Sequence, residues 1–198
     1  MSDLLEILNK RRSIYNLGKD IPVSEDVVVN LIKKAIEIAP TAFNSQSARL
    51  VILIKESHLK FWNIVLDTLK KIVPENKFDN TQKRILSFAN GYGTILFFED
   101  MNIVHELENK YPEYAKNMSI WAEQSNGMLQ YMVWSLLANE NIGANLQHYN
   151  PIVDEDVKKE FNINSSWKLI AQMPFGNILK PADKKSVIDI NQRLKIFK

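Results

Sequence analysis

The clearest pattern of apolar and polar positions in this chain lies between Ser119 and Pro151. Apolar side chains recur there every three or four residues, which is typical of an amphipathic helix. Three aromatic side chains widen the apolar surface beyond one stripe: Trp121, Tyr131 and Trp134. Because such a helix is usually buried on several sides, we predict a central helix that packs in the core or across a subunit interface. We expect its N-cap at Ser119 and its end just before Gly143.

Other segments with helical spacing lie on both sides of this central helix. The first is expected from Ser2 or Asp3 to about Arg12, and the second follows an N-cap at Ser24 and stops at Pro40. The remaining helices are expected at about residues 57–72, 81–90, 103–110, 113–117 and 154–161, with a turn at 74–79.

Three short apolar runs have the length and composition of buried strands, at residues 50–54, 93–98 and 167–173. Pro174 is expected to break the third strand. Helices outnumber these strands and their connections are irregular, so we predict an α+β sandwich that forms a single domain over residues 1–198. From Ile178 the chain is polar but ends in apolar residues, which favours docking of this tail on another surface, such as a second subunit: Leu194, Ile196 and Phe197.

Composition narrows the possible functions. The chain has 198 residues, of which 45% are hydrophobic and 24% are charged, as in a globular protein with a sizeable core. A formal net charge of +2, from 25 basic and 23 acidic residues, argues against nucleic-acid binding. The absence of cysteine excludes thiolate nucleophiles, iron–sulfur clusters and cysteine zinc sites. No apolar run is long enough to span a membrane or to form a signal peptide, so a cytoplasmic location is expected.

Two polar motifs could bind a ligand. Arg11, Arg12 and Ser13 follow the first helix, and their guanidinium and hydroxyl donors suit phosphate oxygens. The alternative is that these arginines only complement the C-terminal end of a helix and face solvent. Asn44 and Gln46 could recognise the edge of a heterocycle, because each amide both donates and accepts. Their alternative role is to satisfy local backbone groups in a loop.

Familiar catalytic motifs are missing from the sequence. Gly91, Tyr92 and Gly93 precede a strand rather than follow one, so they do not form a dinucleotide-binding fingerprint. The three histidines, His58, His105 and His148, lack metal-ligand spacing, and we expect no metal site. No acid–base pair or nucleophile stands out, so we assign no catalytic residue. If the protein is an enzyme, we expect a cofactor to carry the chemistry.

Taken in order, the motifs resemble those of the flavin-dependent nitroreductase family: Arg-Arg-Ser at 11–13, Pro-Thr-Ala-Phe-Asn-Ser-Gln-Ser at 40–47, the central helix and a basic tail. Three stretches are similar to one branch of small bacterial nitroreductase-like oxidoreductases: GYGTILFFED at 91–100, GANLQHYNP at 143–151 and KLIAQMPFG at 168–176. The resemblance covers essentially the whole chain. It implies a nitroreductase-like α+β sandwich with a central mixed or antiparallel sheet, flanking helices and a long central helix in a homodimer interface.

The resemblance also implies an FMN site at each of two dimer interfaces, built by both subunits. The phosphate and ribityl end would be held by basic and hydroxyl side chains: Arg11, Arg12, Ser13, Lys185 and Arg193. Along the flavin would lie Asn44 and Gln46, with Thr41, Ala42 and Phe43 arriving from the partner subunit. Backbone N–H groups near the flavin N5 edge would come from a single loop: Gln147, His148, Tyr149 and Asn150.

The chain departs from the family pattern at two places. Many members carry a basic residue two positions after the motif serine, where a cation stabilises the anionic reduced flavin near its pyrimidine edge. Here that position is Tyr15, which removes this charge from the flavin site. The Gln-Pro-Trp of other branches is replaced by Gln46, Ser47 and Ala48, which changes the floor of the pocket.

The function implied by the resemblance is that of a flavin-dependent oxidoreductase. It would pass electrons from NADH or NADPH through FMN to a small acceptor, such as a nitroaromatic or a quinone, by a ping-pong mechanism. Two alternatives stay open at this point. One is a non-catalytic FMN-binding or stress-sensing protein, and the other is a helical interaction protein whose aromatic helix serves only assembly.

Overall fold

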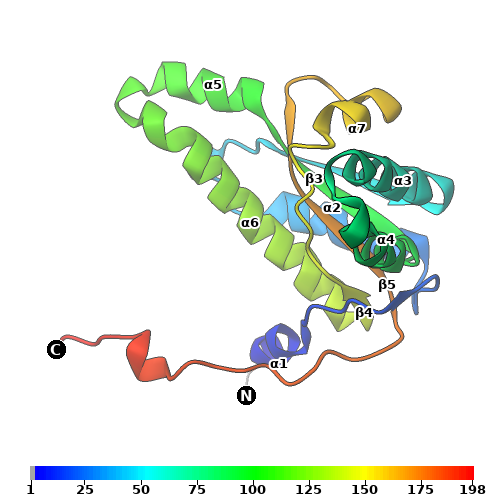
Figure 1. Ribbon diagram of the computed structural model, residues 1–198. Helices are drawn as coiled ribbons and strands as arrows, with labels where there is room; N and C mark the ends of the chain where they lie inside the picture. Colours follow the sequence, from blue (N-terminus) through cyan, green and yellow to red (C-terminus); the bar gives the residue numbers. More distant parts are fainter. Residues whose placement is uncertain (1–2) are drawn as a thin grey trace.

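The computed structural model describes residues 3–198, and a five-stranded sheet forms its centre (Figure 1). The strand order is β1-β5-β3-β2, with β4 also paired to β5, and every pairing is antiparallel. The strand bounds are β1 Leu17–Gly18, β2 Ala48–Ile54, β3 Gly93–Asp100, β4 Ile142–Ala144 and β5 Trp167–Ile178. The sheet is therefore fully antiparallel rather than mixed.

Helices cover both faces of the sheet. The α-helices are α1 Asp3–Lys10, α2 Glu25–Ile38, α3 Lys55–Ile72, α4 Glu75–Ala89, α5 Met101–Lys110, α6 Ala115–Asn139 and α7 Asp154–Glu160. Short 3₁₀ helices are η1 Ala42–Asn44, η2 Pro112–Tyr114 and η3 Ile190–Gln192. The N-cap expected at Ser2 lies outside the described residues.

Strand β3 divides the core into two clusters, because successive side chains of a strand point to opposite faces. Ile95 and Phe97 pack with α2 and α6, whereas Leu96 and Phe98 pack with α3, α4 and α7. All four side chains are fully buried. Figure 1 shows α6 on one side of the sheet and α3, α4 and α7 on the other. This arrangement confirms the predicted α+β sandwich.

Helix α2 begins and ends as predicted. The Ser24 side chain caps it by accepting a hydrogen bond from the Val27 N–H at 3.4 Å. The helix ends at Ile38, two residues before Pro40, which has no N–H to continue the ladder and disfavours helical geometry in the residue before it.

The boundaries of the central helix differ from those predicted. Helix α6 begins at Ala115, so Ser119 lies inside it and donates to Glu108 Oε1 at 3.4 Å instead of capping. The chain reverses after the helix at Asn141, where φ is 59°. Gly143 lies in β4, where a Cβ would come within 3.0 Å of the Ile14 side chain. This glycine therefore allows close approach of two segments and does not end the helix.

Two predictions about proline were also wrong. Pro174 does not break the third strand, because β5 continues to Ile178. The Pro174 carbonyl faces away from β3 and accepts from the Asn145 N–H at 3.3 Å. The N–H that proline lacks would point to this same side, where β4 has already ended, so the strand tolerates proline at this position. The segment expected to form a turn at 74–79 is helical instead, because α4 begins directly after Pro74. Proline is tolerated there because the N–H groups at the start of a helix have no intrahelical partner.

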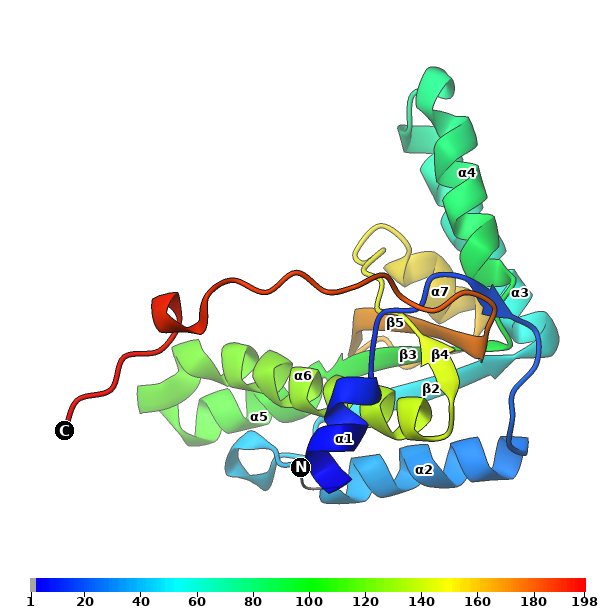
Figure 2. The same cartoon turned by 90° about the horizontal axis from the view of Figure 1, so that it is seen from below.

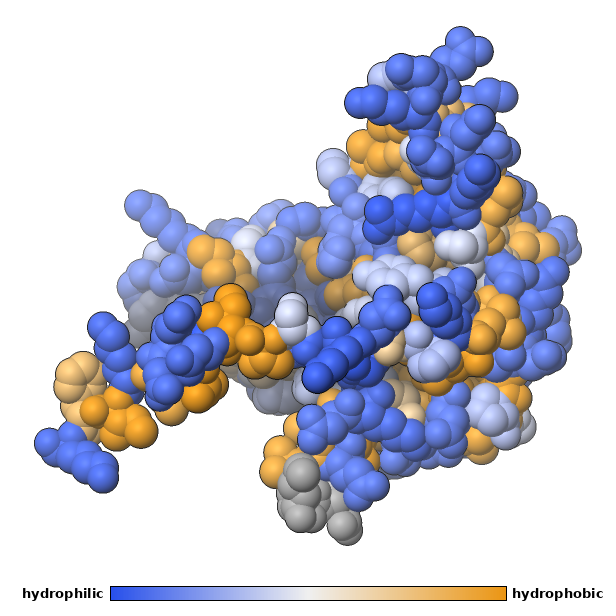
Figure 3. Space-filling model, turned by 60° about the horizontal axis from the view of Figure 1, so that its bottom comes forward, coloured by the Kyte–Doolittle hydropathy of each residue, from blue (hydrophilic) through white to orange (hydrophobic). Residues whose placement is uncertain are grey.

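Several apolar side chains remain exposed in the single chain. Leu4 and Leu5 of α1 are exposed, as are Ile120, Met128 and Tyr131 on α6. Beyond β5 the chain extends away from the body (Figure 2), and apolar side chains are spread along it (Figure 3): Val187, Ile188, Ile190, Leu194, Ile196 and Phe197. Within residues 3–198, no helix has the length and hydrophobicity needed to cross a bilayer.

Candidate functional site

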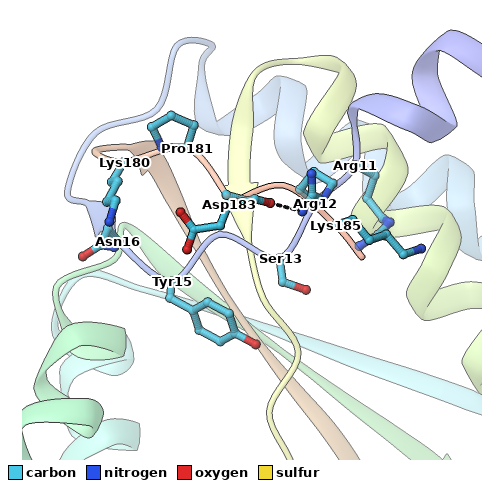
Figure 4. A pocket seen from close by; sticks show the side chains of 10 residues that line it. Arg11, Arg12, Ser13, Tyr15, Asn16, Lys180, Pro181, Asp183 and Lys185 are labelled. Carbon is cyan, nitrogen blue, oxygen red and sulfur yellow. Dashed lines mark hydrogen bonds between the residues drawn. The ribbon is translucent and has the colours of Figure 1, made fainter. Parts of the chain in front are cut away.

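A cavity of about 400 Å³ lies where the segment after α1 meets the segment after β5. Figure 4 shows that its walls come from near both ends of the chain. The lining residues are Arg11, Arg12, Ser13, Tyr15, Asn16, Lys180, Pro181, Ala182, Asp183 and Lys185. Four of these side chains are basic and one is acidic, so the cavity favours an anion.

The segment after α1 is held in an extended conformation against β4. The Ile14 N–H donates to the Ala144 carbonyl at 2.9 Å, and the fully buried Asn145 Nδ2 donates to the Ile14 carbonyl at 2.7 Å. Ile14 is buried, while the side chains of Ser13 and Tyr15 line the cavity. This alternation follows from the twofold side-chain period of extended backbone.

Arg11 carries an unusual unpaired donor. Its guanidinium lies over the rings of Trp134 and Tyr131 on α6, with Cζ 4.4 Å and 5.7 Å from the two ring centroids. Within residues 3–198, the buried Nε of Arg11 has no hydrogen-bond partner. Because buried polar groups are nearly always satisfied, this donor points to a ligand that supplies an acceptor.

The tail is tied to the same segment through Arg12. Its Nη2 donates to the Asp183 backbone carbonyl at 2.5 Å, the contact marked in Figure 4. Lys185, two residues farther along the tail, lines the same cavity. Arg193 lies farther along the exposed tail, directly after η3, and does not line the cavity.

The second group of expected flavin-binding residues lies elsewhere in the chain. Thr41, Asn44 and Gln46 line a separate cavity of about 290 Å³ beside α6. Gln46 donates its backbone N–H to Thr41 Oγ1 at 3.1 Å, and Phe43 stacks on Tyr111 with ring centroids 4.7 Å apart. One chain therefore does not bring the two halves of the expected site together.

Backbone strain marks this second group. Phe43, Asn44 and Gln46 have φ values of 55°, 51° and 49°, in the left-handed region that residues with a Cβ rarely occupy. Strain of this kind is concentrated at functional sites.

The loop 147–150 is organised by a residue that sequence reasoning missed. The fully buried Gln172 accepts from the Tyr149 N–H at 2.7 Å through its side chain and from the Gln147 N–H at 2.7 Å through its carbonyl. Its Nε2 also donates to Asn150 Oδ1 at 3.1 Å. Two of the N–H groups expected near flavin N5 are thus used within the chain, and the prediction now rests on His148 and Asn150. The sequence signal for this role of Gln172 was the presence of a polar residue in an otherwise apolar strand.

Side chains in this loop have different surroundings. The Gln147 side chain is buried and donates to Asn145 Oδ1 at 2.7 Å, so it supports the segment after α1 from behind. The Tyr149 ring packs edge-on against Trp62, and burial raises the pKa of the Tyr149 hydroxyl. The His148 side chain is exposed. Across residues 3–198, no group of three or more histidine and carboxylate side chains could hold a metal ion.

Comparison with known proteins decides the relationship of the chain. The model of the nitroreductase family matches residues 8–177. The chain belongs to the nitroreductase family. Membership makes it an oxidoreductase.

Similar proteins match nearly the full length of the chain. Nitroreductase CinD from Lactococcus lactis is 41% identical, with a TM-score of 0.92 over 99% of this chain and 100% of CinD, and has been solved with nicotinic acid. Other structures of CinD contain chloramphenicol or 4-nitrophenol. HBN1 of Saccharomyces cerevisiae is 32% identical over 187 residues, which are 93% of this chain and 92% of HBN1.

A more distant structure shares the fold alone. A nitroreductase from Desulfitobacterium hafniense with bound FMN is 14% identical, with a TM-score of 0.74 over 100% of both chains.

Proposed function

We propose that the protein binds FMN in the cavity after α1 and passes electrons from NADH or NADPH to a small acceptor such as a nitroaromatic or a quinone. The observation that carries this proposal is the buried, unpaired Nε of Arg11 in a cavity rich in basic side chains. Family membership and the FMN bound by the D. hafniense protein support the choice of cofactor. Chloramphenicol and 4-nitrophenol, seen bound to CinD, are both nitroaromatics and support the class of acceptor.

The residues present suit the phosphate end of FMN. A guanidinium edge matches two phosphate oxygens, and the Ser13 hydroxyl and the Lys185 ammonium add further donors at the same cavity. Arg12, whose Nη2 already binds the tail, keeps Lys185 near these groups. Arg193 does not line this cavity within one chain, so we assign the basic side chain that the tail contributes to Lys185.

The protein contributes positioning and electrostatics to the reaction. Bound FMN would supply the redox chemistry, that is, hydride transfer from a nicotinamide and reduction of an acceptor that takes its place in the same pocket. Tyr15 lies at the cavity where many family members place a cation, so the chain offers a hydroxyl there instead of a charge. His148 and Asn150 are the residues of loop 147–150 that we assign to the N5 edge.

We also propose that the working form is a homodimer of single-domain subunits. A second copy would bring Thr41, Phe43, Asn44 and Gln46 to the flavin, and would cover the exposed apolar side chains of α1 and α6. The tail from about residue 178 to 198 would dock on the partner subunit. Large apolar patches on a single chain are typical of an interface, and the exposed apolar side chains of α1, α6 and the tail would contribute to one.

The visible spectrum of the purified, dialysed protein tests this proposal. We expect flavin bands, and about one FMN released per subunit on denaturation. A colourless protein that also fails to take up added FMN would exclude the oxidoreductase mechanism. FMN retention with negligible NADH and NADPH oxidation against a broad acceptor panel would instead favour a non-catalytic FMN-binding or stress-sensing role.

Arg11→Ala provides the matched test of the site. We expect its FMN affinity to fall by about tenfold or more, because charge-assisted hydrogen bonds to a phosphate are lost. Lys184→Ala is the control, since Lys184 is an exposed cation that does not line the cavity. Unchanged FMN affinity in Arg11→Ala would contradict the assignment.

A further inference from the structure

Two aromatic side chains of α6 form a platform beneath Arg11. Tyr131 and Trp134 are three residues apart on the helix, so their rings lie on the same face. The Arg11 Cζ lies 4.4 Å from the Trp134 centroid and 5.7 Å from that of Tyr131. Guanidinium groups stack on aromatic faces at such distances by cation–π attraction.

Trp134 also fixes the backbone that carries Ser13. Its Nε1 donates to the Ala144 carbonyl at 3.2 Å, and the same carbonyl accepts the Ile14 N–H at 2.9 Å. One side chain therefore connects α6, the end of β4 and the segment after α1.

Cation–π contact with the rings does not use the hydrogen-bond donors of the guanidinium. The hydrogen bonds of a guanidinium lie in its plane, whereas the aromatic rings contact its face. The buried Arg11 Nε, which has no partner within residues 3–198, is one of these in-plane donors. Stacking also restricts the arginine before any ligand arrives, which reduces the entropy lost on binding.

We propose that Trp134 and Tyr131 are positioning residues that orient Arg11 toward a phosphate monoester and so let the site select FMN over riboflavin. This inference rests on the proposed FMN site and deepens it. Trp134 contributes both the larger share of the platform and the bond to Ala144, so it is the dominant member. Tyr131, whose exposed fraction is 44%, contributes an outer edge.

Flavin titration of the apoprotein separates this role from a general structural one. Riboflavin lacks the phosphate, so loss of Arg11 orientation should weaken FMN and leave riboflavin nearly unaffected. For Trp134→Leu we expect the Kd for FMN to rise by about three- to tenfold or more, from loss of stacking and of anchoring. The Kd for riboflavin should change by less than about twofold, which is within ordinary context effects.

Further variants test the parts of the platform. Trp134→Phe keeps an aromatic face but loses the Nε1–H, so its Kd for FMN should lie between those of Trp134→Leu and the wild type. Tyr131→Leu removes a partly exposed ring and should give a smaller, still FMN-selective loss, so it tests the idea even if Trp134→Leu fails to fold. In an Arg11→Ala background, Trp134→Leu should reduce FMN selectivity by less than it does in the wild type, because only the anchoring of the segment that carries Ser13 is still lost.

Three outcomes would overturn the inference. Equal weakening of FMN and riboflavin would make Trp134 a general structural residue, and unchanged affinity for both in Trp134→Leu and Tyr131→Leu would remove the platform from the site. A selective loss that is equally large in the Arg11→Ala background would place the whole effect outside Arg11. A wild-type protein that binds neither flavin would reject the proposed function itself, which distinguishes that failure from failure of the platform.

Discussion

His58 lies buried against the sheet as a neutral ring. Its Nε2 lies 3.1 Å from the Ala89 carbonyl, which can only accept, so we assign the proton to Nε2. Nδ1 then accepts from the Thr94 hydroxyl at 2.9 Å, while the same hydroxyl oxygen accepts from Trp62 Nε1 at 2.9 Å. Burial lowers the pKa of His58 from 6.5 to about 4, although the Ala89 hydrogen bond opposes the shift.

This lowered pKa predicts a loss of stability in mild acid. The unfolded chain protonates His58 below its ordinary pKa of 6.5, whereas the folded chain resists protonation until about pH 4. The contribution of neutral His58 to the free energy of unfolding is therefore fully present above pH 6.5 and is lost as the pH falls toward 4. At pH 5 the lost free energy of unfolding should be about 2 kcal/mol.

Urea unfolding of the wild type and His58→Gln at pH 7.5 and pH 5 measures this contribution. Glutamine keeps polar atoms at the site but does not titrate, so the difference in stability between the two proteins should narrow by about 2 kcal/mol at the lower pH. If the free energy of unfolding changes with pH equally in the two proteins, titration of His58 does not affect stability as predicted.

At the level of elements, strand β5 supports loop 147–150 through Gln172. Replacing it with leucine should leave the Tyr149 N–H without its 2.7 Å acceptor and lower the free energy of unfolding by about 1–3 kcal/mol. We also expect faster amide hydrogen exchange confined to this loop, because its anchor to the sheet is lost.

Gln82→Leu is the matched control for Gln172→Leu, since Gln82 is exposed on α4. It should change the stability by less than about 0.5 kcal/mol. If Gln172→Leu is as stable as this control and its loop exchanges at the wild-type rate, the loop does not depend on Gln172.

At the scale of the whole molecule, the tail should matter for assembly rather than for folding of the subunit. The apolar side chains from Val187 to Phe197 are exposed in the single chain, so removing residues 187–198 should leave the unfolding transition of the domain intact. The same deletion removes apolar surface from the proposed dimer interface and should shift the protein toward monomer, while Lys185 remains.

Light scattering coupled to size-exclusion chromatography, across a range of concentrations, measures this shift. Lys195→Ala is the control, because it alters the tail without removing its apolar side chains. A truncated protein that stays dimeric at the same concentrations as the wild type would rule out a stabilising role for the tail.

Patterns within short stretches predicted most of the elements correctly. The apolar run at β3 and the Ser24 cap of α2 report which groups are buried or satisfied locally, and both were confirmed. The predicted helix boundaries were wrong where a residue type can serve several structural roles. Ser119 has the chemistry of a cap but lies within α6, and Gly143 serves close packing rather than a helix end.

The local motif Arg-Arg-Ser identified one wall of the candidate site from sequence alone, since the chemistry of those side chains does not depend on the fold. The placement of Lys185 beside it, and of Arg193 away from it, depends on the course of the tail and its bond to Arg12. The stacking of Arg11 on Trp134 and the anchoring of loop 147–150 by Gln172 likewise join segments far apart in the chain. Periodicity records which face of an element is buried, but it carries no information about which distant side chain will meet that face.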